Sequence, residues 1–257
     1  MSGTSARGER LGGSGLVQLM RLAAKTNVVE LALGTPGAPE PSAKLVTEAG
    51  YALLPGDHHQ YADPIGHPQL RVAIAASLAT PADPETEITV TVGGTEGLCA
   101  ALLSIVDSGD EVVVFEPFYE NFIKAIHLAG AVPRFVRLRQ PGWHYDPAEF
   151  AAAFGSRTRA LILNSPNNPT GRILTRTELE EIARVCDNWD VTVISDEVYS
   201  SYVYDGATFT SAADVPALSG RSIVVNSLSK SHAISGWRLG YLRAPAEMTT
   251  VVAGRTR

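Results

Sequence analysis

Short apolar runs alternate with helical stripes along the chain from about residue 68 onward. Almost continuous apolar runs lie at residues 111–115, 160–163, 191–194 and 223–225, and an alternating run at 87–92. Apolar residues at helical spacing separate these runs, at 70–78, 98–105, 122–129 and 179–186. Runs without a polar side are typical of strands that are buried on both faces. We therefore predict an α/β fold, a mostly parallel sheet sandwiched by helices.

The first 45 residues precede this alternation and differ from it in composition. They are rich in Gly and Pro, and residues 1–15 lack the apolar core of a secretory signal. We predict a flexible tail and N-terminal arm in residues 1–45, followed by a large domain in residues 46–257.

Composition narrows the classes of partner. The 257 residues are 45% hydrophobic and 19% charged, with a net charge of −6 and no block of Lys and Arg, which argues against nucleic acid. No apolar run reaches the length that spans a membrane. Cys99 and Cys186 lie within apolar helical patterns, which favours free thiols and a cytoplasmic location.

A lysine follows the last apolar run. Lys230 lies among short polar residues, with Ser227 before it and Arg238 after it. A lysine amine attacks carbonyl groups when burial or a nearby cation disfavours its protonated form. Arg238 can supply that cation and can also bind a phosphate through two nitrogens. A lone lysine in a Ser-rich loop is usually a solvated surface residue, so other strand ends must supply the rest of a site.

Two further segments lie where strands end. Gly94 and Thr95, within Gly93-Gly94-Thr95-Glu96-Gly97, separate a strand from a helix and predict a phosphate cradle made of backbone amides. The spacing matches neither dinucleotide nor Walker loops, and a plain tight turn is the alternative. Tyr119 follows the strand at 111–115, where its ring can stack on a planar heterocycle or simply cover the core.

Two more strand ends carry polar groups. Asn168 precedes Pro169, which favours an extended backbone and an amide that can donate to a phenolic oxygen; a structural turn is the alternative. Asp196 ends an apolar strand, where a carboxylate is costly unless it is paired, for example with a protonated pyridine nitrogen. A helix N-cap is the alternative for Asp196. Tyr199 can reach the hydroxyl oxygen of the same ring. Together the segments predict a site for pyridoxal 5'-phosphate.

At this point the chain resembles the class I/II aminotransferases, the fold-type-I pyridoxal-phosphate enzymes, from about Val28 to its C-terminus. The motifs that carry the resemblance are Gly93-Gly94-Thr95-Glu96, Pro117-Phe118-Tyr119, Asn167-Asn168-Pro169-Thr170-Gly171, Asp196-Glu197-Val198-Tyr199 and residues 227–238. The segments at 116–119, 143–147 and 203–206 resemble the kynurenine, glutamine and methionine aminotransferase branch.

The resemblance implies a role for each matching residue. Lys230 is expected to form the imine with pyridoxal phosphate and to move the proton between substrate and cofactor carbons. Asp196 is expected at the pyridine nitrogen, and Asn168 with Tyr199 at the ring hydroxyl oxygen. The other expected contacts are Tyr119 on the ring face, Gly94, Thr95, Ser227 and Arg238 at the phosphate, Tyr61 at the phosphate of a partner subunit, and Gly34 with Asn168 near the substrate. The family further implies a homodimer that acts on small amino acids and 2-oxo acids.

The chain departs from the family pattern at its C-terminal end. Members of the family continue into a C-terminal small domain with an arginine for the substrate carboxylate, and Arg255 and Arg257 do not match that arginine. The expectation is therefore a large domain incomplete at its C-terminal end, with weak or absent turnover. Three hypotheses stay open on the residues alone: amino-group transfer, carbon–sulfur β-lysis on the same cofactor, and a truncated remnant that only binds cofactor.

Overall fold

A computed structural model of the chain describes residues 3, 5–29, 31, 34, 36, 40–54 and 59–254. Its central feature is a seven-stranded sheet. The strands are β1 (Ile88–Thr91), β2 (Glu111–Glu116), β3 (Val132–Arg137), β4 (Thr158–Asn164), β5 (Thr192–Asp196), β6 (Ser222–Ser227) and β7 (Gly240–Arg243). Arg255 and Arg257 lie outside the described residues.

The sheet order is β1-β7-β6-β5-β4-β2-β3, and its pairs are parallel except those of β7, which runs antiparallel to both neighbours. The mostly parallel sheet expected from the sequence is therefore confirmed. Because the parallel strands point the same way, the ends of β4, β5 and β6 meet at one edge of the sheet.

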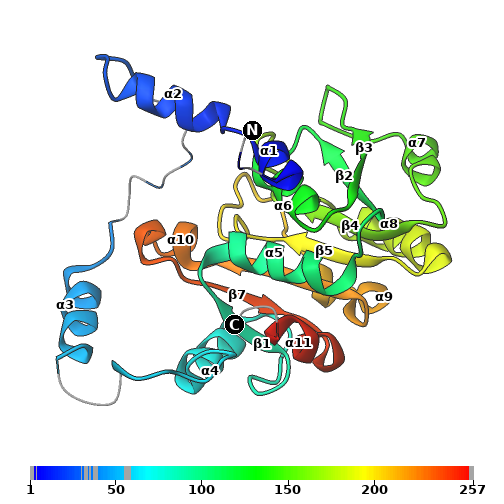
Figure 1. The fold of residues 1–257 in the computed structure, drawn as a ribbon. Helices are drawn as coiled ribbons and strands as arrows, with labels where there is room; N and C mark the ends of the chain where they lie inside the picture. Colours follow the sequence, from blue (N-terminus) through cyan, green and yellow to red (C-terminus); the bar gives the residue numbers. More distant parts are fainter. Residues whose placement is uncertain are drawn as a thin grey trace.

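Helices cover both faces of the sheet (Figure 1). The helices of the described residues, whether or not they cover the sheet, are in chain order α1 (Ala6–Leu11), α2 (Gly15–Ala23), α3 (Ala43–Ala52), α4 (Pro68–Ser77), α5 (Gly93–Ile105), α6 (Glu120–Leu128), α7 (Pro147–Ala152), α8 (Arg176–Trp189), α9 (Pro216–Ser219), α10 (Leu228–Ser231) and α11 (Ala246–Ala253). Short 3-10 turns, η2 and η3, lie at Ala212–Asp214 and Ser235–Trp237.

The continuous apolar run of β2 is explained by the packing of helices on both faces of the sheet. Val112 and Val114 pack with α5, α6 and α11, whereas Val113 and Phe115 pack with α7 and α8 on the opposite face. Successive side chains of a strand point to opposite sides, so a strand covered on both sides needs apolar residues at every position. A smaller cluster joins α4 to the β1 and β7 edge through Ile74, Ile88 and Tyr241.

The N-terminal segment contains helices, although its Gly-rich composition predicts a tail. The side chains of Ser5 and Ser14 cap α1 and α2, which explains how short helices start there. Ser14 also donates to Glu120 of α6 over 2.6 Å. In contrast, α2 and α3 bury none of their described side chains, and Figure 1 shows both standing away from the sheet.

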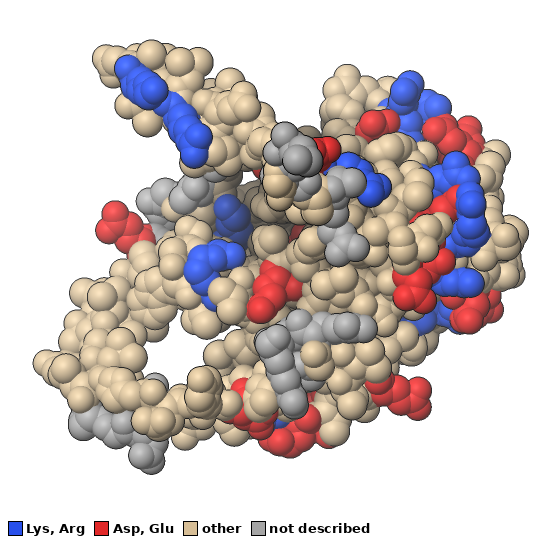
Figure 2. Space-filling view, viewed as in Figure 1, with Lys and Arg blue, Asp and Glu red and all other residues tan. Residues whose placement is uncertain are grey.

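Charges of both signs are interspersed on the molecule at the β3 and α7 end (Figure 2). Arg134 and Arg157 share the buried Glu111 carboxylate at 2.9 and 2.7 Å, and Arg139 pairs with Glu149 at 2.6 Å. Both cysteines are free thiols, as expected. Within the described ranges, no helix combines the length and the apolar character needed to cross a bilayer.

Candidate active site

The candidate site forms where three neighbouring strands end. Asn164, the last residue of β4, pairs in register with Asp196, the last residue of β5. The Asn164 amide donates to the backbone oxygen of Asp196 over 3.1 Å, and its side-chain oxygen accepts from the Asn168 amide over 2.7 Å. Ser227 ends β6 next to them. The sheet therefore fixes the relative positions of residues far apart in the sequence.

Asp196 has the environment of an ion-pairing group without its counterion. Its side chain is buried, and one carboxylate oxygen accepts from the Val198 amide over 3.2 Å. Among the described residues no cation lies within ion-pair distance of it. Burial raises the pKa of Asp196 from 3.8 to about 6. No helix starts here, so the N-cap alternative does not apply, and the carboxylate is available to a cationic ligand.

Lys230 lies on α10, directly after β6. The Ser227 hydroxyl caps this helix by accepting from the Ser229 amide over 3.1 Å. The Lys230 ammonium donates to the backbone oxygen of Gly34 over 2.6 Å and lies 5.9 Å from the Tyr199 ring centre. Burial lowers the pKa of the Lys230 amine. The lowering comes from burial rather than from the neighbouring Arg238 that the sequence suggested.

The first turn of α5 makes the predicted cradle. Gly93 and Gly94 begin the helix, and the amides of a first turn have no partner inside the helix. Gly93 has a φ of +78°, and a β-carbon there would collide with the Arg238 guanidinium. Gly240 approaches so closely that its own β-carbon would lie 2.5 Å from the Gly93 carbonyl carbon. These contacts place an arginine beside free backbone amides, a suitable setting for a phosphate.

Two tyrosines line the space between the cradle and the lysine. The Tyr119 hydroxyl accepts from the Asn121 amide over 2.7 Å, and burial together with the Asp196 charge raises the pKa of Tyr119. The same two causes raise the pKa of Tyr199. The Tyr199 hydroxyl lies 3.5 Å from where a Gly34 β-carbon would be. Both phenols therefore stay neutral donors near Asp196.

The structure brings most of the predicted residues to this edge of the sheet. They are Gly34, Gly94, Thr95, Tyr119, Asn168, Asp196, Tyr199, Ser227, Lys230 and Arg238. Tyr61 is fully exposed. The roles of all these residues remain predictions, because the structure fixes positions and not contacts with a ligand.

Sequence reasoning missed three residues that hold the site together. Asn164 links β4 to β5, Asn121 orients the Tyr119 hydroxyl, and Tyr202 donates to the Lys230 backbone oxygen over 2.8 Å. An amide directly after an apolar run was a usable signal for Asn164. Nothing in the local sequence distinguishes Tyr202 from an ordinary surface tyrosine.

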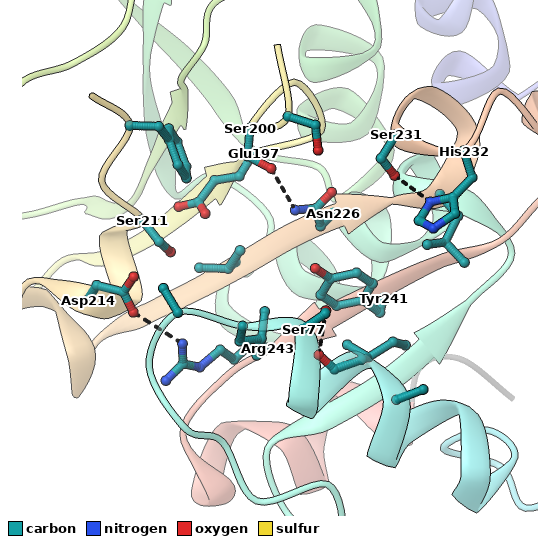
Figure 3. A pocket seen from close by; sticks show the side chains of 18 of the residues that line it. Ser77, Glu197, Ser200, Ser211, Asp214, Asn226, Ser231, His232, Tyr241 and Arg243 are labelled. Carbon is teal, nitrogen blue, oxygen red and sulfur yellow. Dashed lines mark hydrogen bonds and ion pairs between the residues drawn. The ribbon is translucent and has the colours of Figure 1, made fainter. Parts of the chain in front are cut away.

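A separate cavity of about 510 Å³ lies on the other face of β6 (Figure 3). Leu228, Ser231 and His232 line it from α10, and Asp214 and Arg243 pair across its wall at 3.4 Å. Burial raises the pKa of Glu197 in this wall to about 7. Glu197 accepts from Ser195 and from the Ala212 amide, so it anchors the loop at η2. The predicted cofactor residues lie outside this cavity.

The residues present fit pyridoxal phosphate. Asp196 is a buried carboxylate without a cation among the described residues, Lys230 is an amine with a lowered pKa, and the Gly93 turn lies directly against the Arg238 guanidinium. Asp196 would suit the ring nitrogen of the cofactor, Lys230 its aldehyde, and the Gly93 turn with Arg238 its phosphate. The fold and the site together have the arrangement of a domain that binds pyridoxal phosphate at the edge of a sheet.

The chain belongs to the family of class I and II aminotransferases, whose family model matches residues 26–257. Enzymes of this family depend on pyridoxal phosphate. Kynurenine–oxoglutarate transaminase 1 of Homo sapiens is 37% identical over 247 residues, which cover 89% of this chain and 58% of the human protein. This similarity supports the kynurenine branch suggested by the sequence motifs.

Solved structures agree with the fold. The N-succinyldiaminopimelate aminotransferase from Mycobacterium tuberculosis superposes with a TM-score of 0.92 at 35% identity, covering 98% of this chain and 67% of that one. The YbdL protein from Escherichia coli, described as having a methionine aminotransferase function, superposes with a TM-score of 0.89 at 31% identity, covering 96% of this chain and 66% of that one. The chain spans a little over half the length of the curated relatives it matches.

Proposed function

We propose that this chain carries the cofactor-binding part of an aminotransferase that moves an amino group between an α-amino acid and a 2-oxo acid. The observation that supports this most strongly is that Asp196 and Lys230 follow two neighbouring strands, Asp196 at the end of β5 and Lys230 on the helix after β6. One is a buried acid without a counterion, and the other is an amine that burial makes less basic. The relatives' names favour transfer over the carbon–sulfur lyase alternative.

Each side chain has a task in this proposal. Pyridoxal phosphate supplies an aldehyde carbon and a ring that accepts an electron pair from the substrate. Asp196 keeps the ring nitrogen protonated, and the amides of the Gly93 turn with Arg238 hold the phosphate. Lys230 Nζ would be the base that moves a proton between the substrate α-carbon and the aldehyde carbon of the cofactor.

Two more residues act on the ring itself. Tyr119 covers one face of the ring, and Tyr199 donates to the ring hydroxyl oxygen together with Asn168. Burial, followed by the charge of Asp196, raises the pKa of both tyrosines and keeps them protonated. A neutral phenol is a hydrogen-bond donor, as this task requires.

The proposal includes a homodimer in which each subunit contributes residues to the active site of the other. It also places the protein in the cytoplasm. Tyr61 is fully exposed, as expected of a residue that serves the site of a second copy, and α2 and α3 leave Leu19, Leu22 and Tyr51 exposed. The free thiols Cys99 and Cys186 support a reducing compartment. We propose residues 1–45 as arm and residues 46–257 as the large domain.

Hydride trapping tests the cofactor site. Borohydride reduction of the protein with pyridoxal phosphate, followed by peptide mass spectrometry, should find the adduct on Lys230. Lys230→Ala should abolish it, whereas Lys124→Ala should keep it, because Lys124 pairs with Glu120 at 3.1 Å outside the site. An adduct on another lysine, or none, would refute the proposal.

Substrate turnover tests the reaction. Kynurenine, methionine and N-succinyldiaminopimelate are the first donors to try, with 2-oxoglutarate as acceptor, since relatives carry these names. Each effective donor should yield its own 2-oxo acid together with an equal amount of glutamate, and without the acceptor it should instead bleach the aldehyde form of the cofactor once per site. Release of pyruvate and ammonia from a cysteine conjugate without an acceptor would instead indicate the lyase.

A further inference from the structure

Tyr202 reaches the candidate site from behind the lysine. It follows Asp196 in the tight turn at residues 197–202, where its amide donates to the Tyr199 backbone oxygen over 2.8 Å. Its hydroxyl donates to the Lys230 backbone oxygen, also over 2.8 Å. The rings of Tyr199 and Tyr202 are 6.2 Å apart in an edge arrangement. One residue thus joins the segment that carries Asp196 to the helix that carries Lys230.

The helix that carries Lys230 is short and is held at its start, where Ser227 caps it and the Leu228 amide donates to the Leu239 backbone oxygen over 3.0 Å. It is four residues long, and the carbonyl groups at the end of a helix lack partners within it. Besides the Tyr202 hydroxyl, the backbone amide of Ala233 donates to the Lys230 backbone oxygen over 3.2 Å. On its other side, Ser231 and His232 face the cavity of about 510 Å³ (Figure 3). The Tyr202 hydroxyl is therefore a side-chain donor that holds the Lys230 carbonyl at the end of α10 from outside the helix.

We propose that Tyr202 is a positioning residue that holds Lys230 in place for covalent attachment of the cofactor aldehyde. The inference rests on the proposed function and adds to it a residue that touches neither cofactor nor substrate. In the attachment, Lys230 Nζ bonds to the aldehyde carbon, and the aldehyde oxygen leaves as water with the two amine protons. Because the hydroxyl bond fixes the backbone of Lys230, its loss makes this step less favourable without altering the phosphate cradle.

Tyr202→Phe removes the hydroxyl and keeps the ring. The probes are pyridoxal phosphate, which attaches to the lysine, and pyridoxamine phosphate, whose amine replaces the aldehyde and prevents attachment. We expect Tyr202→Phe to weaken pyridoxal phosphate binding and to slow borohydride-trapped attachment by about three- to tenfold, the value of one hydrogen bond. Pyridoxamine phosphate should bind unchanged. Tyr204→Phe is the matched control, because Tyr204 is 67% exposed and lies two residues away.

The outcomes separate the possibilities. A loss for pyridoxal phosphate alone supports the positioning role. Equal losses for both probes show a general structural effect and overturn it, as does no change for either. A thermal melt of each variant checks that the fold persists. If the wild-type chain forms no adduct at Lys230, the proposed function itself fails; if it does and Tyr202→Phe behaves like wild type, only the positioning role fails.

Discussion

Replacing Asp196 with Asn should make the cofactor-free protein more stable, even though it should impair cofactor binding. The carboxylate is 9% exposed, has no cationic partner among the described residues and has a pKa raised by burial. Asn has nearly the same shape, and its oxygen can still accept from the Val198 amide. The substitution therefore removes a charge that burial disfavours in the cofactor-free protein and keeps the local turn.

The pKa of Asp196 gives the size and sign of the effect. Its pKa rises from 3.8 to about 6 on folding, and each unit is worth about 1.4 kcal/mol, so the ionised group costs about 3 kcal/mol. For a raised pKa, the full stability is present below the unfolded value and is lost as the pH rises through the folded value. Asp196→Asn should thus gain about 1–3 kcal/mol at about pH 8 and almost nothing below about pH 4.

Urea unfolding of the cofactor-free proteins, followed by circular dichroism at several pH values, measures this difference. Glu197 also has a raised pKa, but it is present in both proteins and cancels. Asp214→Asn is the control, because Asp214 pairs with Arg243 and its loss should lower stability near neutral pH. An Asp196→Asn protein less stable than wild type at about pH 8, or a difference that does not depend on pH, would contradict the reasoning. Saturating pyridoxal phosphate should reverse the order of stabilities.

Other substitutions and reagents test the cradle, the core and the thiols. Gly93→Ala should push Arg238 aside and weaken pyridoxal phosphate binding by at least about tenfold in a fluorescence titration, because its φ is positive and its β-carbon has no room. Leu161→Ala should lower the free energy of unfolding by about 2–5 kcal/mol in urea, since Leu161 is fully buried. Burial raises the pKa of Cys186 to about 12, so Ellman's reagent should label it only after unfolding. Cys99, half-buried with a smaller rise in pKa, should react slowly in the native protein.

The sequence predicted strands best where both faces of the strand are buried, because every position must then be apolar. The strands β2, β4, β5 and β6 were predicted because each is a nearly continuous apolar run. The edge strand β3 was missed, since Val132 and Phe135 alternate with polar or proline positions on an exposed edge. The four-residue β7 was missed because it is too short for a periodic signal. The N-terminal helices were missed because the Gly- and Pro-rich composition of residues 1–45 was given more weight than local signals, such as Leu16, Leu19 and Met20 at helical spacing in α2.

The candidate site divides in a similar way. Asp196 and Lys230 could be found because a charged residue after a buried strand is unusual. Tyr202 could not be assigned, because its value depends on which distant backbone oxygen it meets. For Asn164 the apolar run before it was a signal of a strand end, but its bond to the Asp196 backbone oxygen could not be foreseen. That meeting is set by sheet register, which the local sequence does not specify.

The short helix α10 separates two compartments with different chemistry. Lys230 faces the sheet edge, whereas its neighbours Ser231 and His232 face the cavity behind. A bulkier or smaller side chain at the rear would shift the amine without altering any group that meets the cofactor. The reactivity of the lysine is therefore adjustable from its unreactive side, which gives protein engineers a way to tune this amine while the front of the site stays intact.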